Sequence, residues 1–508
     1  MANDLKILFV LIIAAGASFF LMKPNKFRSI SEPEYTSIFL LFIYIQLIFI
    51  FSKNIYIFIV VILILCIWKI KNGRSQTEII YSVFLFSLPV FGLNIPFINF
   101  DLSYPMIISA IFLSPMISGT GYRRTLHSKI KNNSTDIILL LLLSAFLIGQ
   151  ARDNSITHII KQFLYLSLFV YVPYYITKFI FCHKHSADRA IYTLLSIGLI
   201  FSIVGSFESS RNWLLWQGPL QSYEIFESIS SYTKLRSGFL RSQTIFGNTL
   251  TFGSYFIILT GFTLYLRRRY IDKQKFIYIF LVVMLGLFFT FGRGQQISVL
   301  MVVVSFALIN HKNSILIYRT AQISILAFLG AFLVMGPSMF AVNADTLHGL
   351  FGADIGSIQY RIKILEVLSG GISNTWLFGP RPNEFNALYP ELVQGEGIVD
   401  MVNVYLATGV TSGMIGLFLL MFLLLNLLKS ALTSIKQASL LKLNADGSLT
   451  ALGRCLTAIL IGWMFSMGTT SLTTMGWPLF AVILGMCSGY VTMIQQMKID
   501  AEAVELAP

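Results

Sequence analysis

The feature that most constrains this chain is a succession of apolar runs, many long enough to cross a bilayer, separated by short polar gaps. A helix of about 20 mostly apolar residues spans the hydrocarbon core of a membrane. Of the 508 residues, 56% are hydrophobic and only 12% are charged, whereas a soluble domain carries about 25% charged residues. Because an unpaired backbone amide in hydrocarbon costs several kcal/mol, the runs must be helical. The sequence therefore predicts an all-α fold, a polytopic transmembrane helical bundle.

The apolar runs predict about 14 transmembrane spans. This number counts 38–68 as one long tilted helix, whereas a hairpin that turns at Ser52 and Lys53 would add one span. We favour the smaller number, which places both termini on the cytoplasmic side. With that region written as two runs, the predicted spans are 6–22, 38–52, 55–68, 79–92, 105–118, 137–150, 159–181, 190–207, 245–266, 276–291, 295–310, 315–335, 404–428, 453–468 and 474–494.

Lysine and arginine are concentrated in alternate gaps between these runs. The positive-inside rule makes the basic gaps cytoplasmic, so the other gaps face outward and the C-terminus lies inside. The net charge of +14 follows from this topology, because the basic residues are scattered and do not form one nucleic-acid-binding face. The basic gaps contain Lys69, Lys71 and Arg74; Arg123, Arg124, Lys129 and Lys131; Arg267, Arg268, Arg269, Lys273 and Lys275; and Lys429, Lys436 and Lys442.

Two outward gaps, 208–244 and 336–403, are far longer than a simple connection requires. The larger loop is expected to be partly helical, with an apolar face that lies on the membrane surface. That face consists of Ile355, Ile358, Ile362, Leu365 and Leu368. The chain is thus divided into N-terminal membrane helices (1–207), a first long loop (208–244), further membrane helices (245–335), a large loop (336–403), and C-terminal membrane helices with a short cytoplasmic tail (404–508).

Five of the arginines on the outward side, where the charge rule disfavours them, are candidates for a functional role. Arginine stays charged, and its planar fork matches phosphate oxygens in pairs, so a group of them suits a diphosphate. The alternative is that each arginine snorkels or forms an ion pair at the membrane surface. For Arg293, in a tight turn between two spans, we favour function because charge near the bilayer is costly. The five are Arg236, Arg241, Arg293, Arg361 and Arg381.

Four segments, in order and on the outward side, carry a family resemblance. They read RSQTIFGNTLTFGSY, FGRGQQISVL, YRIKILEVLSGGISNTWLFGPRPNEF and VNVYLATGVTSGMIGL. Together they resemble the O-antigen polymerase and O-antigen ligase superfamily of bacterial membrane proteins over about residues 190–495. The N-terminal spans match by hydropathy alone.

The resemblance implies a glycosyltransferase at the periplasmic face of the inner membrane. It would take a glycan from undecaprenyl diphosphate and transfer it to an acceptor hydroxyl, without metal, nucleotide or other cofactor. Matched by motif position, the arginines thought to hold the diphosphate are Arg241, Arg293 and Arg361, followed by Arg236 and Arg381. The donor and acceptor glycans and the lipid bilayer are the implied partners, with a chain-length regulator and a flippase as further candidates.

One departure separates this chain from the ligases of the family. Ligases carry His-Asn where the helix after the large loop begins, and here the pair is Val402-Asn403. His348 lies too early in the loop to replace that histidine. This difference favours a polymerase, which extends lipid-linked repeat units of an O-antigen, capsule or exopolysaccharide. A ligase acting on lipid A-core and a transporter for the same lipid remain the alternatives.

The chemistry needs cations on the leaving diphosphate and a base for the acceptor proton. Arg293 is the cation predicted to act in catalysis, and Asp400, followed by Glu396, is the predicted base; the alternative for either acid is a solvated loop residue. No metal is expected, because His183 and His185 lie in a cytoplasmic gap and no metal-binding motif occurs.

Two further groups of residues are assigned structural roles. Trp213 and Trp216, in the first long loop, are interpreted as interfacial anchors in preference to platforms for a sugar. Gly409, Gly413 and Gly416 are expected to let the helix that follows the large loop pack closely against another helix.

Overall fold

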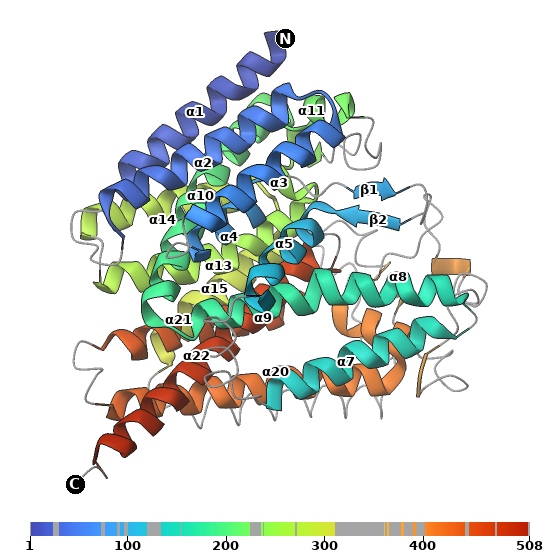
Figure 1. Ribbon diagram of the computed structural model, residues 1–508, viewed down its shortest axis with the longest axis vertical. Helices are drawn as coiled ribbons and strands as arrows, with labels where there is room; N and C mark the ends of the chain where they lie inside the picture. Colours follow the sequence, from blue (N-terminus) through green and yellow to red (C-terminus); the bar gives the residue numbers. More distant parts are fainter. Residues whose placement is uncertain are drawn as a thin grey trace, which may run out of the picture.

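The computed structural model describes a predominantly helical bundle (Figure 1). Within its described residues, nine helices are long and apolar enough to cross a membrane, which agrees with an all-α polytopic protein. The described residues are 2–23, 30–72, 77–88, 92–95, 100–118, 134–152, 154–223, 235–236, 238–269, 272–309, 360, 363–364, 377–379, 390–392, 401, 403–441, 447–472 and 475–505.

The helices and strands follow one another along the chain with these bounds. The N-terminal half contains α1 (Ala2–Met22), α2 (Glu32–Phe51), α3 (Ile55–Asn72), α4 (Thr77–Leu85), β1 (Gly92–Ile95), β2 (Phe100–Ser103), α5 (Tyr104–Ser118), α7 (Ser134–Ala151), α8 (Ile156–Leu166), the π-helix η2 (Ser167–Tyr171), α9 (Val172–Phe181), α10 (Lys184–Arg211) and α11 (Gln217–Ser222). The C-terminal half contains β3 (Leu235–Arg236), β4 (Phe239–Leu240), η3 (Thr244–Phe246), α13 (Thr249–Arg269), α14 (Lys273–Phe288), α15 (Arg293–Leu308), η6 (Pro390–Leu392), α20 (Val404–Leu440), α21 (Ser448–Met467) and α22 (Gly476–Glu505).

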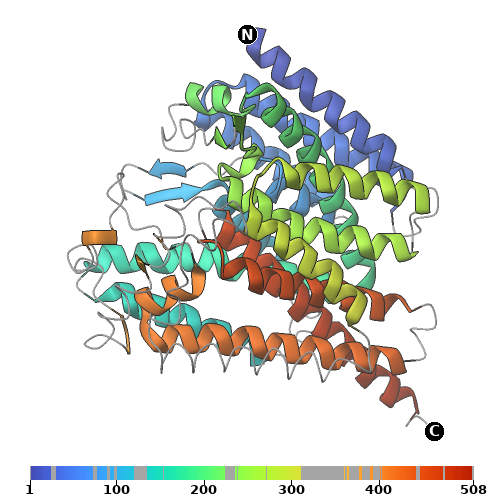
Figure 2. The ribbon, with the colours of Figure 1, turned by 180° about the vertical axis from the view of Figure 1, so that it is seen from behind.

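The centre of the bundle is formed by helices that neighbours cover almost completely. α10, α13 and α22 bury most of their apolar residues, whereas α1 leaves Leu5, Phe9 and Phe20 exposed, as a lipid-facing helix does. Seen from behind, α13, α14 and α15 lie side by side (Figure 2).

Two predicted spans are wrong. The region 38–68 is not one tilted helix, because α2 ends at Phe51 and α3 starts at Ile55, and the rings of Phe49 and Phe58 lie 5.4 Å apart across the turn. The region 79–92 is not a full span either, because α4 has nine residues and an antiparallel hairpin of β1 and β2 follows it. A nine-residue helix is about 14 Å long, about half the thickness of the hydrocarbon core.

The two ends of the bundle are named after one arginine each. At the Arg293 end, α15 begins and α10 ends; at the Arg189 end, α10 begins, and Arg189 bonds Glu34 of α2 (2.5 Å) and Glu78 of α4 (3.1 Å). α10 therefore runs from the Arg189 end to the Arg293 end of the bundle.

The two termini lie at opposite ends of the bundle, which corrects the prediction that both face the cytoplasm. Lys53, in the turn after α2, bonds Asp4 near the start of α1 at 2.9 Å. At the other end of α1, Lys275 donates to the carbonyl of Lys23 at 3.2 Å. α1 thus begins at the Arg293 end, whereas α22 finishes at the Arg189 end (Figure 1).

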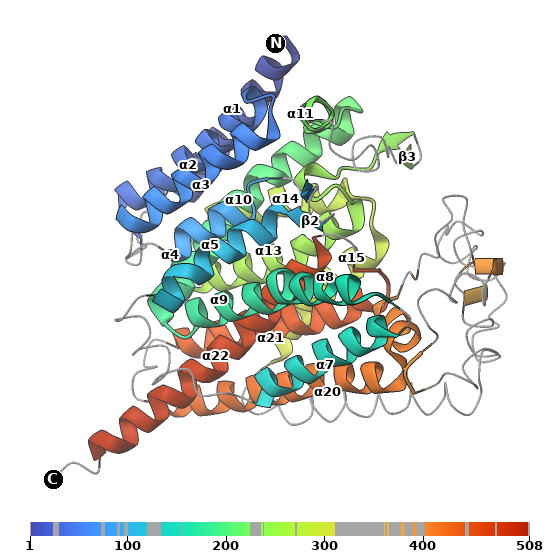
Figure 3. The same ribbon diagram turned by 45° about the vertical axis from the view of Figure 1, so that its right-hand side comes forward.

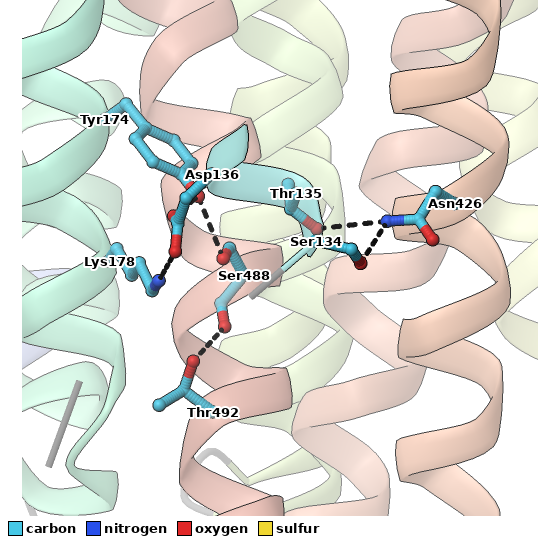
Figure 4. A network of polar contacts seen from close by, with 8 residues as sticks. All are labelled: Ser134, Thr135, Asp136, Tyr174, Lys178, Asn426, Ser488 and Thr492. Carbon is cyan, nitrogen blue, oxygen red and sulfur yellow. Dashed lines mark hydrogen bonds and ion pairs between the residues drawn. The ribbon is translucent and has the colours of Figure 1, made fainter. Parts of the chain in front are cut away.

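A buried ion pair fastens α7 to α9 and α22 (Figure 4). The Nζ of Lys178, a fully buried side chain, lies 2.6 Å from Oδ2 of Asp136. The hydroxyl of Tyr174 donates to Asp136 Oδ1 (2.5 Å), and it lies 3.0 Å from Oγ of Ser488. Such a pair is tolerated inside a bundle because each charge is compensated by the other and by neighbouring polar groups.

Two glycines of α22 make this contact with α9 close. A Cβ on Gly485 would lie 2.5 Å from the carbonyl oxygen of Tyr174, and a Cβ on Gly489 would overlap the carbonyl oxygen of Lys178. Small residues four apart are the usual means by which membrane helices approach each other. The ion pair therefore lies at the closest part of the contact between α9 and α22.

Candidate functional site

Arg241 and Arg293 are brought to one turn at the Arg293 end. The Nε of Arg241 donates to the carbonyl of Thr290 at 3.0 Å, and the next amide, of Ser242, donates to Phe289 at 3.1 Å. Thr290 and Phe289 belong to the turn between α14 and α15, and Arg293 is the first residue of α15. The side chain of Arg293 is exposed and that of Arg241 is partly buried. Two guanidinium groups and the positive end of a helix dipole thus occupy the same edge of the bundle.

The hairpin of β3 and β4 brings a third arginine toward this turn. Arg236 is paired with Phe239 across the hairpin, and the ring of Phe239 stacks on that of Phe291 with centroids 6.3 Å apart. Phe291 lies in the turn itself, two residues before Arg293. The backbone of Arg236 is therefore carried by an element that packs on the turn, while its side chain lies outside the described residues.

The two glycines that flank Arg293 lie in closely packed surroundings, and at Gly294 the neighbour is another segment of the chain. A Cβ on Gly294 would overlap the hydroxyl oxygen of Thr469, in the chain that follows α21. A Cβ on Gly292 would overlap the side-chain amide oxygen of Gln295. The turn is thus packed against the end of α21, which limits how far Arg293 can be displaced.

Glu208 fixes the segment that carries Arg241, and sequence reasoning missed it. Its carboxylate is fully buried near the end of α10, and it accepts backbone amides from Leu215 (3.0 Å), Gln243 (3.2 Å) and Thr244 (2.9 Å). Thr244 has a φ of 48°, which is unfavourable for a β-branched residue and needs such support. In the sequence, the only sign of this role was that Glu208 is a single carboxylate at the outward end of the apolar run 190–207.

The described part of the large loop packs on the first turns of α20. Ile364, Leu392, Met401 and Val410 form a separate buried cluster, and the hydroxyl of Tyr360 donates to the carbonyl of Leu392 at 3.2 Å. The third and fourth segments of the family resemblance are therefore in contact. The five residues of the predicted helical face lie outside the described residues; nearby Tyr360, Lys363 and Ile364 have helical backbone.

Asn403 links the start of α20 to the site around Arg293. Its side-chain oxygen accepts the amides of Tyr405 (2.9 Å) and Leu406 (3.2 Å), which caps the helix. Its side-chain nitrogen donates to the carbonyl of Gly468 at 3.1 Å, one residue before the Thr469 that touches Gly294. The described parts of the four segments thus meet at the Arg293 end of the bundle.

The remaining predicted site residues cannot be placed. Asp400, Glu396, Arg361 and Arg381 lie outside the described residues, as do Val402 and His348. The structure therefore brings together Arg241 and Arg293, places the backbone of Arg236 beside them, and leaves both carboxylates and two arginines as predictions.

Two further predictions concern metal ligands and the tryptophans of the first long loop. Among the side chains that the structure describes, no group of three or more His, Cys, Asp and Glu residues is arranged to hold a metal ion. The prediction for Trp216 is wrong, because this side chain is buried and its Nε1 donates to Oε1 of Gln46 at 3.1 Å. It anchors the first long loop to α2, and it faces neither lipid nor a sugar site.

Comparison with known families finds no family model that matches the chain, and comparison with curated proteins finds no match. The family resemblance therefore rests on the four segments themselves.

Proposed function

We propose that the chain is a metal-independent glycosyltransferase of the O-antigen polymerase type. It joins undecaprenyl-diphosphate-linked repeat units into an O-antigen, capsule or exopolysaccharide at the periplasmic face of a bacterial inner membrane. The observation that carries the proposal is the bond from Arg241 to Thr290, in the turn that leads to Arg293. Two cations held at the edge of an apolar bundle suit a ligand with an apolar tail and an anionic head.

In the proposed reaction, the acceptor hydroxyl oxygen attacks the anomeric carbon of the donor sugar. The bond from that carbon to the phosphate oxygen breaks as the new glycosidic bond forms, and the configuration at the carbon is inverted. Arg241, Arg293 and Arg361 stabilise the departing diphosphate, assisted by Arg236 and Arg381. Asp400, or Glu396 in its place, takes the proton of the acceptor hydroxyl.

The sidedness of the proposal follows from the distribution of positive charge. Arg267, Lys273 and Lys275, at the connection from α13 to α14, lie at the Arg189 end, which we assign to the cytoplasm. The Arg293 end then faces the periplasm, where lipid-linked repeat units are available after export across the membrane. The N-terminal end of α1 is periplasmic in this orientation.

The transporter alternative draws support from one observation. Transporters use broken helices near the middle of the bilayer, and α20 is broken at Gly413, where the backbone has φ +66° and ψ −168°. The break, however, is filled by chain from the large loop, because the carbonyl of Leu377 accepts the amide of Ile415 there at 3.3 Å. The polymerase proposal accounts for the arginines as well, and we retain it.

Deletion of the gene, followed by size separation of the cell's surface polysaccharide, distinguishes the three functions. We expect long chains to disappear while single repeat units remain attached to their usual acceptor, because attachment does not need polymerisation. If all repeat units vanished from lipid A-core while polymer accumulated on undecaprenyl diphosphate, the protein would be a ligase. An unchanged size distribution would contradict both, whereas loss of all surface repeat units without polymer on undecaprenyl diphosphate would favour the transporter class. A plasmid copy of the gene is the control.

A further inference from the structure

The break in α20 is a docking place for the large loop. Gly413 interrupts the helix with φ +66°. Beyond it, the amide of Ile415 donates to the carbonyl of Leu377, a residue of the large loop, at 3.3 Å. Irregular backbone inside a membrane bundle persists only where other protein groups satisfy it. The segment 377–379 supplies such groups at the break.

Two glycines make the fit reciprocal. A Cβ on Gly413 would overlap the carbonyl oxygen of Leu377, and a Cβ on Gly379, whose φ is +74°, would overlap the carbonyl oxygen of Val410. The loop backbone therefore occupies the space that a side chain at position 413 would need, and the backbone of α20 occupies the space that a side chain at position 379 would need. Gly413 does serve close packing, as its sequence predicted, but its partner is a loop segment and not a second helix.

Arg152, which comes from a third element, also bonds the docked loop segment. It directly follows α7, and its Nη1 donates to the carbonyl of Gly379 at 3.0 Å while its Nη2 donates to the carbonyl of Phe378. The guanidinium carbon lies 5.9 Å from the centre of the Phe378 ring. α7 reaches this position because Gly149 lets it approach α20: a Cβ there would lie 2.9 Å from the carbonyl oxygen of Thr411. α7 lies beside the first half of α20 (Figure 3), from Gly149 opposite Thr411 to Ser134, whose Oγ accepts from Asn426 Nδ2 at 2.9 Å.

The contacts of Arg152 with Phe378 and Gly379, together with the break at Gly413, are called the clamp. The clamp holds the start of the loop segment 380–402, and the end of that segment is held as well. Gly379 is held by Arg152, and Asn403 is held as the cap of α20 and by its bond to Gly468. The intervening residues, 380–402, include three of the predicted site residues, namely Arg381, Glu396 and Asp400. Fixing both ends of a segment reduces the number of conformations available to it.

We infer that Arg152 is a positioning residue of the proposed transferase, which holds the large loop in the break of α20 so that the segment 380–402 starts from a fixed point. This inference rests on the proposed function for its catalytic consequence, but the clamp itself is independent of it. Arg152 donates to the backbone carbonyls of Phe378 and Gly379, and we assign it a positioning role on the basis of these two bonds. Its loss should therefore slow turnover through misplaced loop residues, while Arg241 and Arg293 still bind the lipid diphosphate.

The test compares Arg152→Ala with Arg211→Ala, a matched control that removes an exposed arginine from the end of α10 at the same end of the bundle. Using the purified full chain and lipid-linked repeat units, we expect Arg152→Ala to lower kcat about 10- to 100-fold and to change KM about twofold or less. Arg152→Lys should recover only part of the loss, because one ammonium group does not reproduce a fork that donates to two adjacent carbonyls.

A second readout does not depend on activity. The segment 380–402 contains Glu384, Glu391 and Glu396, so a glutamate-specific protease reports its accessibility. We expect faster cleavage there in Arg152→Ala, and also in Gly413→Ala, which obstructs the same docking place from the side of α20. Arg211→Ala should be cleaved like the wild type.

The outcomes separate this inference from the proposed function. If the wild type polymerises and Arg152→Ala matches Arg211→Ala in turnover and cleavage, the inference is overturned and the function stands. Faster cleavage with unchanged turnover would also overturn the positioning role. If the wild type makes no polymer but Arg152→Ala is cleaved faster, the polymerase proposal and its catalytic consequence fail, while the clamp is supported.

Discussion

Replacement of Arg241, Arg293 and Arg361 together by alanine is expected to abolish long polymer while the protein remains in the membrane at wild-type abundance. Removal of one preorganised donor from a site of charge development commonly lowers a rate about 10²- to 10³-fold, and three such losses exceed what a growing cell can compensate. Arg241 donates to the turn that leads to Arg293, and Arg361 is assigned to the same task by its position in the resemblance. The measurement is the size distribution of surface polysaccharide from cells that carry only the variant.

The control for this prediction is Arg211→Ala, which removes a cation from the same end of the bundle without touching the turn. It should leave the size distribution unchanged. Because Arg241 also bonds Thr290, a variant with Arg241→Lys in place of the alanine tests whether loss of local structure explains the defect. Normal polymer in the triple variant at wild-type abundance would falsify the assignment of these arginines.

The largest expected effect on stability comes from breaking the buried ion pair. Lys178→Met leaves the carboxylate of Asp136 in a buried position without its cation, and removal of one partner of such a pair costs about 3–5 kcal/mol. We expect a large fall in the midpoint of thermal denaturation of the detergent-purified protein. The double variant Asp136→Leu/Lys178→Met should recover much of the loss, because two apolar side chains leave no unpaired charge.

Lys429→Met is the matched control for this pair. Lys429 is an exposed lysine on α20, so its replacement should change the midpoint little. If Lys178→Met behaved like Lys429→Met, or if the double variant were as unstable as the single one, the ion pair would not be what fastens α7 to α9.

Hydropathy predicted the long helices well and failed where apolar residues do not form spans. The runs at 137–150, 190–207 and 453–468 correspond to α7, α10 and α21. Residues 79–88 are buried among other helices, so they are apolar without forming a full-length helix, and apolarity alone does not reveal that the helix stops at Leu85.

The region 38–68 was wrongly predicted as one helix for a different reason: the partner of the charged residue Lys53 could not be identified from the sequence. Lys53 marks the turn between α2 and α3, with a φ of 50°, and it is stabilised by Asp4 of α1. A lysine in the middle of an apolar region reads as a minor interruption until its partner is known. Once it is recognised as a turn, α2 and α3 become separate helices, and the start of α1 lies at the same end of the bundle as that turn.

Of the site, the sequence predicted the convergence but not the residues that enforce it. The sequence assigned Arg241 and Arg293 to the outward side, and in the structure Arg241 donates to the turn that leads to Arg293. Glu208 and Arg152 were missed because each of them bonds backbone groups far away in the chain, Glu208 to amides and Arg152 to carbonyls. Because backbone amides and carbonyls occur along the whole chain, the sequence pattern does not predict which of them a side chain will bond.

The most direct test of the central claim is reconstitution of the purified chain in lipid vesicles with undecaprenyl-diphosphate-linked repeat units, in the presence of a chelator and without nucleotide. The proposal predicts a ladder of longer lipid-linked glycans and release of undecaprenyl diphosphate in proportion to the bonds formed, with neither product in the triple arginine variant. Repeat units that stay single after long incubation with folded wild-type protein would contradict it.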